Sequence, residues 1–156
     1  MKKMVVLTLL FSFLLSAFNC AQSKEIQPEK VNDYYESSKN IVKNKHYYFI
    51  GEVVYSNKNK EKLNSNANTI EINNSKVSGI VMSLKIENKS FNITGDIENY
   101  KALFEDDKRH ISVSFDVTRV NQTYSVFIDV KPNRNAFLTV STGNYNTISW
   151  TGTIKK

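Results

Sequence analysis

The sequence predicts an α+β domain in which one N-terminal helix packs on a curved antiparallel sheet of about seven or eight strands, as a half-barrel or barrel-like fold. Three observations lead to this prediction. Apolar residues follow a helical spacing after Pro28, they alternate with polar residues through the C-terminal half, and turns that contain Asn, Gly or Pro separate the alternating runs. Such alternation is typical of antiparallel strands with one face buried and one face in water.

The first residues have the layout of a secretory signal peptide, which we assign to residues 1–19. Two lysines follow Met1, and the run from Met4 to Phe18 is almost wholly apolar. A helix that crosses a membrane needs about 20 apolar residues, whereas this run is shorter and ends in polar sequence. A basic start, a short apolar core and small residues near its end are the features of a signal peptide.

Cys20 is the single cysteine of the chain and follows directly after this leader. The stretch SAFNCAQ resembles the lipobox of bacterial lipoproteins, in which the cysteine is acylated and becomes the first residue. It departs from the usual pattern at Ala17 and Asn19, where Leu and a small residue are common. The resemblance implies lipidation of Cys20 and a protein anchored in the cell envelope, in the periplasmic or surface leaflet of the outer membrane. Ordinary cleavage after Ala21 is the alternative, and it would give a soluble secreted or periplasmic protein.

The polar residues 20–28 are expected to form a tether to a single domain at 29–156. Within that domain the helix is predicted first, from Glu29. Its apolar or small residues recur at intervals of three and four, which places them on one helix face: Val31, Tyr34, Tyr35, Ser38, Ile41 and Val42. Pro28 suits a first helical turn, and Glu29 adds negative charge at the positive end of the helix dipole. We expect this helix to cover the sheet.

From His46 the apolar period changes to two, the period of a strand. Runs of strand character cover 46–55, 69–73, 76–86, 91–94, 111–118, 124–130, 136–140 and 148–154. The stretch from Ser56 to Asn68 is rich in Lys and Asn and is predicted to be a solvated loop. In the clearest run, Ile111 to Thr118, every odd residue is apolar and every even residue is polar. We therefore expect a set of inward-pointing side chains: Ile111, Val113, Phe115, Val117, Val126, Ile128 and Trp150.

Four stretches of the chain are SSKNIVKNKHYYFIGEVVY, ANTIEINNSKVSGIVMSL, GDIENYKALFEDDKRH and TYSVFIDVKPNRNAFLTVSTGNYNTISWTGTI. In this order they resemble the helix and first strand, the next strand pair, the Gly-Asp segment and the closing strands of the DUF4251 family, small Bacteroidota lipoproteins of undescribed function. The resemblance runs from Ser37 to Ile154. The family usually carries Leu-Pro-Tyr-Phe-Gly after the second strand, where this chain has residues 81–85, VMSLK. The resemblance implies no catalytic residues.

No set of catalytic groups is gathered in the sequence. His46 and His110 are far apart and have no cysteine or carboxylate at metal-ligand spacing, whereas zinc sites use three or four such ligands. The carboxylates of residues 105–107 stand beside Lys108 and Arg109, which is typical of a locally neutralised turn, and they lack the spacing of a calcium loop. Nucleophile elbows and phosphate-binding glycine loops are also missing. We therefore expect no enzyme, no metal and no cofactor.

The net charge of +6 comes from lysines scattered along the chain, without a stripe of arginines and aromatic residues. This pattern does not favour nucleic-acid binding. Two functions of different class are left. The domain could be a non-enzymatic interaction module that docks an envelope partner through a sheet edge or a loop face. Alternatively, it could carry a small apolar ligand in a cavity between the sheet and the helix. These two functions predict different cores: a concave side of the sheet filled by the helix and Trp150 favours the interaction module, and an empty one favours the carrier.

Overall fold

The computed structural model describes residues 28–56, 59–64, 68–85, 87–120, 122–143 and 147–156. The predicted leader at 1–19, Cys20 and the tether up to residue 27 lie outside these ranges. The elements are helix α2 (Pro28–Lys43), 3-10 helix η3 (Asp106–Lys108) and strands β1 (His46–Ser56), β2 (Asn59–Lys62), β3 (Thr69–Asn73), β4 (Lys76–Met82), β5 (Ser90–Asn92), β6 (Gly95–Glu105), β7 (His110–Arg119), β8 (Gln122–Val130), β9 (Asn135–Thr142) and β10 (Thr147–Lys155).

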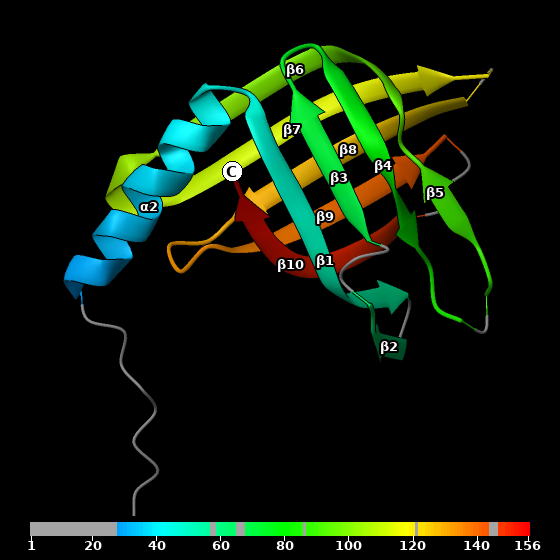
Figure 1. Cartoon of the computed structure of the whole chain (residues 1–156), viewed down its shortest axis with the longest axis horizontal. Helices are drawn as coiled ribbons and strands as arrows, with labels where there is room; N and C mark the ends of the chain where they lie inside the picture. The colour runs from blue at the N-terminus through cyan, green and yellow to red at the C-terminus, as the bar shows by residue number, and fades with distance from the viewer. Residues whose placement is uncertain (1–27, 57–58, 65–67, 86, 121, 144–146) are drawn as a thin grey trace, which may run out of the picture.

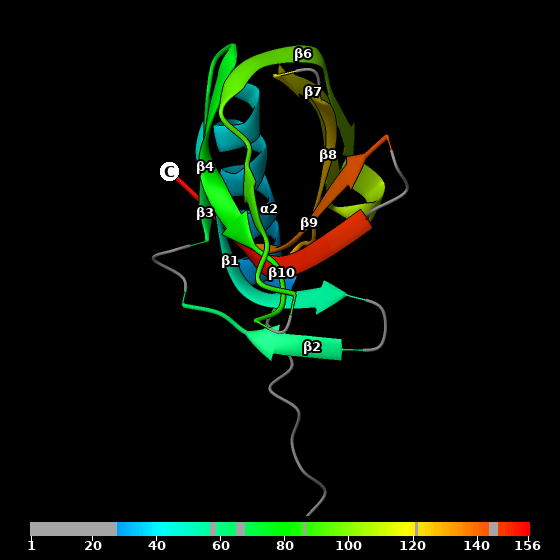
Figure 2. The ribbon, with the colours of Figure 1, turned by 90° about the vertical axis from the view of Figure 1, so that its right-hand side faces the viewer.

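Eight of the strands close into an antiparallel barrel, and this confirms the predicted α+β, barrel-like fold (Figure 1). Their order is β10-β9-β8-β7-β6-β4-β3-β1, and β1 pairs back to β10, with Tyr48 opposite Lys155 and Tyr55 opposite Ser149. β2 extends from β1 and β5 from β4 as two extra strands. Helix α2 lies at one end of the barrel, and Figure 2 looks at the other end, with α2 behind the strands.

The barrel interior is the hydrophobic core of the domain. All seven side chains predicted to point inward from β7, β8 and β10 are at most 2% exposed. Equivalent positions on β3 and β9, among them Ile72 and Leu138, are also buried. The Trp150 ring is fully buried, and its indole N–H donates to the backbone carbonyl of Met82 at 2.7 Å. This bond satisfies the one polar group of the ring, as buried tryptophan requires.

Helix α2 packs against β1, β6 and β10 through the face that the spacing predicts. Tyr35, Ser38 and Val42 are buried on this face. The Tyr35 hydroxyl donates to the Asp106 carboxylate in η3, and Lys39 Nζ contacts the same carboxylate at 2.5 Å. Helix and sheet therefore meet through packed side chains.

Two strands differ from the sequence-based prediction. β2 lies inside the stretch predicted as a loop, and its side chains are mostly exposed, so no apolar alternation marks it. β6 lies where no strand was predicted. Its pairing with β7 shifts register between Glu98 and Lys101, and Asn99 has a left-handed φ of 54°. Such a bulge shifts the alternation of side chains by one residue and hides the period of two.

Within the described part of the chain, no helix is long and apolar enough to cross a membrane.

Candidate functional site

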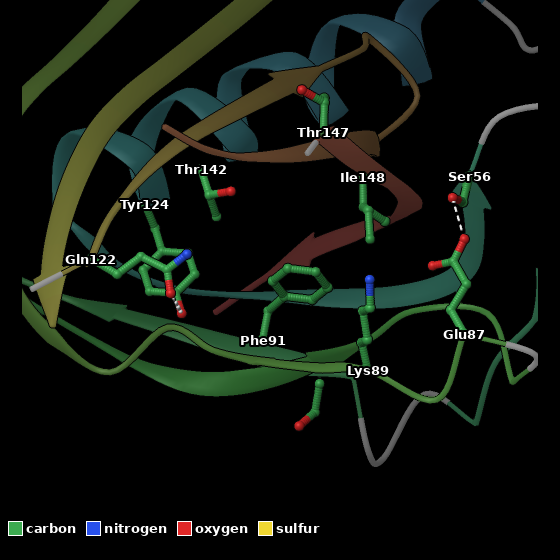
Figure 3. Close-up of a pocket in the computed structure, with 10 residues that line it drawn as sticks. Ser56, Glu87, Lys89, Phe91, Gln122, Tyr124, Thr142, Thr147 and Ile148 are labelled. Atoms are coloured by element: carbon green, nitrogen blue, oxygen red, sulfur yellow. Dashed lines mark hydrogen bonds between the residues drawn. The ribbon is translucent and has the colours of Figure 1, made fainter. Parts of the chain in front are cut away.

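A pocket of about 500 Å³ lies at the end of the barrel away from α2, and we call it the mouth pocket (Figure 3). Its volume falls in the range of roughly 300–1,000 Å³ that is typical of small-molecule sites, and barrel mouths are common places for such sites. One wall comes from β5 and the loop before it, with Glu87, Lys89, Ser90 and Phe91. The facing wall comes from the ends of β1, β8, β9 and β10, with Ser56, Gln122, Tyr124, Thr142, Thr147 and Ile148.

Antiparallel topology brings these side chains together. β8 and β10 begin at this end of the barrel, whereas β1 and β9 finish there. Residues two apart on a strand point to the same face, so the inward series of the core continues into the pocket. Along β1 the series passes from Val54 to Ser56, and along β9 from Val140 to Thr142. The inward-facing side chains are apolar in the middle of the barrel and largely polar at its mouth.

The apolar part of the lining is held in place by its packing contacts. The ring of Phe91 packs against the ring of Trp150, with centroids 5.9 Å apart and planes at 75°, an edge-on arrangement that aromatic pairs favour. Trp150 is itself held by its hydrogen bond to Met82. Ile148, at 6% exposure, completes the apolar part of the lining. A ligand in the mouth pocket would therefore meet a preformed aromatic surface.

Two hydrogen bonds orient polar groups at the rim. Ser56 Oγ donates to Glu87 Oε1 at 2.6 Å, and the Tyr124 hydroxyl donates to Gln122 Oε1 at 3.0 Å. The Lys89 side chain extends beside Phe91 toward Ile148 in Figure 3. Its ammonium group makes no ion pair with any acid among the described residues. The lining thus offers one free ammonium group together with hydroxyl, amide and carboxylate groups.

The two histidines lie outside the mouth pocket. His46 begins β1, is exposed, and stands 4.0 Å from Glu71. His110 begins β7 and lies between two carboxylates, with Nδ1 2.7 Å from Glu105 Oε2 and Nε2 2.5 Å from Asp129 Oδ1. In the sequence no carboxylate stands at metal-ligand spacing from either histidine, yet in the structure His110 has these two carboxylate neighbours. Asp129 reaches His110 because β7 and β8 pair side by side, which spacing along the chain does not reveal.

The carboxylates around His110 are also paired with lysines. Lys108 Nζ lies 2.5 Å from Glu105 Oε1, and Lys131 Nζ lies 2.7 Å from Asp129 Oδ2. Lys108, followed by His110, holds the pKa of Glu105 below its usual range. The neighbouring Asp106 pKa is lowered by Lys39 and then Tyr35. Glu105 is thus neutralised locally by Lys108, as the sequence predicts, whereas Asp106 is neutralised by Lys39 of helix α2.

Both ring nitrogens of His110 are occupied by carboxylates, so neither faces an open space where a substrate could bind. Among the described residues, no group of three or more His, Cys, Asp or Glu side chains is arranged to hold a metal ion. Cys20, the predicted lipidation site, lies outside the described residues. The mouth pocket was not predicted from the sequence. The signal that could have revealed it is the run of polar residues at inward positions of strand ends, such as Thr142.

A family model described as "Domain of unknown function (DUF4251)" matches residues 29–154. The chain belongs to the DUF4251 family. The crystal structure of a DUF4251 family protein from Bacteroides eggerthii DSM 20697 has a similar fold, with a TM-score of 0.67 at 16% sequence identity. The similarity covers 79% of this chain and 87% of that one. None of the curated proteins matches the chain. The family resemblance seen in the sequence is thereby confirmed, and it names no activity.

Proposed function

We propose that this DUF4251 protein is a binding module of the bacterial cell envelope, anchored by a lipid on Cys20, and that it binds a small ligand in the mouth pocket without catalysis. One observation carries the proposal. The inward-facing series of the barrel changes from apolar to polar side chains at the mouth. Polar groups in core-facing positions weaken a core unless they have partners, so their presence at a concave surface favours a ligand-binding role.

The chemistry of the pocket favours binding over catalysis. General acid–base catalysis needs a proton donor or acceptor within hydrogen-bond reach of a reacting group, usually with a tuned pKa. In the mouth pocket the Glu87 carboxylate accepts from Ser56 and lies on the opposite side of the barrel mouth from Tyr124. The imidazole of His110 is held by Glu105 at the start of β7, next to η3, which contacts α2 through Tyr35 and Asp106.

A protein partner would have few strand edges to bind. Barrel closure through β1 and β10 leaves unpaired strand edges, among the described residues, beyond β2 and β5 and along β6 from Glu98 on, because β6 pairs with β4 only at Gly95 and Asp96. Closed barrels reduce the number of such edges in general. β2 and β5 are four and three residues long. Helix α2 packs against β6, so we expect an envelope partner to contact mainly loops and outer side chains.

A second candidate function is to carry a small apolar ligand, at a site different from the one that the sequence suggests. A pocket of about 490 Å³ lies between β2 and the end of β4, with Leu63, Met82 and Leu84 in its lining. The space between helix and sheet is filled by packed side chains such as Tyr35 and Val42. A small apolar ligand would thus fit beside β2 rather than under α2.

Site-specific photo-cross-linking in intact cells tests the proposal. Gln122 and Thr123 are adjacent exposed residues on β8, but only Gln122 lines the mouth pocket. A photoreactive amino acid at residue 122 should give an adduct of discrete mass on the protein, and the same group at residue 123 should not. Adducts of equal yield at both positions, or no adduct at 122, would contradict binding in the mouth pocket.

A further inference from the structure

We infer that the ligand of the mouth pocket is a saccharide; this assignment rests on the proposed function and names its ligand class. Five of the ten lining side chains end in a hydroxyl group, one in an amide, one in a carboxylate and one in an ammonium group. Hydroxyl and amide groups both donate and accept hydrogen bonds. Ser56, Tyr124 and Thr147 already bond to Glu87, Gln122 and Ser141. A ligand rich in hydroxyl groups can pair with the donors and acceptors that remain open in the lining, whereas an apolar ligand would bury these at a cost.

Phe91 supplies the apolar surface that a sugar ring needs. The face of an aromatic ring is negative, so it attracts the polarised C–H groups on the flat side of a sugar. Phe91 is part of the lining and is oriented by its contact with Trp150. Polar side chains, among them Gln122 and Thr142, line the facing wall. One aromatic surface opposite a ring of hydrogen-bonding groups matches a ligand that has C–H faces and hydroxyl edges.

The charges of the lining favour a neutral or singly charged sugar over a phosphate. Glu87 and Lys89 carry opposite charges, so the formal charge of the lining is balanced. Glu87 Oε1 accepts from Ser56, which leaves Oε2 to accept from a ligand hydroxyl. Lys89 has three N–H donors and no acid partner among the described residues. Phosphate sites usually combine several cations or a helix N-terminus, and the described lining has one cation and no helix.

A glycan array probed with the processed protein tests the assignment, because the array presents many different sugars at once. The wild type should bind a defined group of glycans. Phe91→Ala should lose about tenfold in affinity for them, the effect of losing one aromatic contact. Phe137→Ala is the matched control, because Phe137 is 40% exposed and does not line the mouth pocket, and it should bind as the wild type does.

A second pair of variants covers the case in which Phe91→Ala fails to fold. Lys89→Gln should weaken binding to the same glycans, whereas Lys60→Gln, at an exposed position on β2, should not. Trp150 is the single tryptophan and contacts Phe91, so its fluorescence should change as the bound glycan is titrated. An unresponsive Trp150, or equal binding by Lys89→Gln and Lys60→Gln, would overturn the assignment.

The outcomes separate the ligand class from the binding site. If the wild type binds no glycan but a photoreactive group at position 122 captures a molecule without sugar, the saccharide assignment is wrong and the mouth pocket is still the binding site. If position 122 captures nothing and no glycan binds, the saccharide assignment and the proposed function are both wrong.

Discussion

Phe115 and Ser114 are neighbours on β7 with opposite surroundings. The Phe115 ring is 2% exposed and stacks on Tyr100 with centroids 6.2 Å apart, whereas Ser114 is half-buried on the outer face. Phe115→Ala should lower the free energy of unfolding by about 3–5 kcal/mol, the usual result of emptying a large buried site. Ser114→Ala should change it by no more than about 0.5 kcal/mol. Chemical denaturation measures both, and equal losses would show that the assigned register is wrong.

Glu105 should make the stability of the domain depend on pH. Lys108 and His110 lower the pKa of Glu105 in the folded state. The stabilisation that results is complete above the pKa of Glu in the unfolded chain, about 4.3. It is lost as the pH falls through the lower pKa of the folded state. Glu105→Gln should therefore be less stable than the wild type at pH 6, and the difference should shrink toward pH 3.

The control for this titration is Glu98→Gln, at an exposed position on the same strand. Urea denaturation at several pH values would compare the three proteins. A deficit of Glu105→Gln that is constant from pH 6 to pH 3 would contradict a role for these ion pairs in stability.

At the scale of elements, barrel closure depends on close approach of β1 and β10. A Cβ atom at Gly152 would lie 1.9 Å from the carbonyl oxygen of Ile50, closer than any real contact, whereas Gly143 has nothing within 4 Å. Gly152→Ala should therefore push the two strands apart and destabilise the domain by at least about 2 kcal/mol. Gly143→Ala should stay within about 0.5 kcal/mol. Thermal unfolding distinguishes them, and a wild-type melting temperature for Gly152→Ala would argue against this closure.

Periodicity predicted the elements whose side chains divide cleanly between core and water. The stripe on α2 and the alternation of β7 to β10 are of this kind, and the inward set from Ile111 to Trp150 is confirmed. β6 was missed because a bulge near Asn99 breaks its period. β2 was missed because its exposed side chains carry no apolar pattern.

The candidate site was hidden from sequence analysis for a different reason. Its residues come from β1, β5, β8, β9 and β10 and the loop before β5, and most are ordinary strand residues such as Ser and Thr. Only barrel closure brings them to one concave surface. In the same way, the carboxylate partners of His110 come from the ends of β6 and β8. Such contacts between strands cannot be predicted from the spacing of residues along the chain.

At the scale of the whole molecule, we propose that the barrel is held at the membrane by its lipid anchor. Cys20→Ser should move the protein from the membrane fraction to the soluble fraction and abolish its labelling with a fatty-acid analogue. A matched Ser23→Ala variant, three residues further along the predicted tether, should keep both properties. Unchanged membrane retention and labelling of Cys20→Ser would reject the anchor and leave the soluble periplasmic or secreted alternative.

We propose above all that the protein binds a small ligand in the mouth pocket, and an amide chemical-shift map would detect this binding residue by residue. The labelled protein would be titrated with the low-molecular-weight extract of the cell envelope. We predict that the shifts concentrate on the pocket residues, above all Phe91, Gln122 and Thr142, while the outer-face residues Phe127 and Phe137 stay unchanged. Shifts confined to the outer face or to the β2 side, or no shifts at all, would contradict the claim.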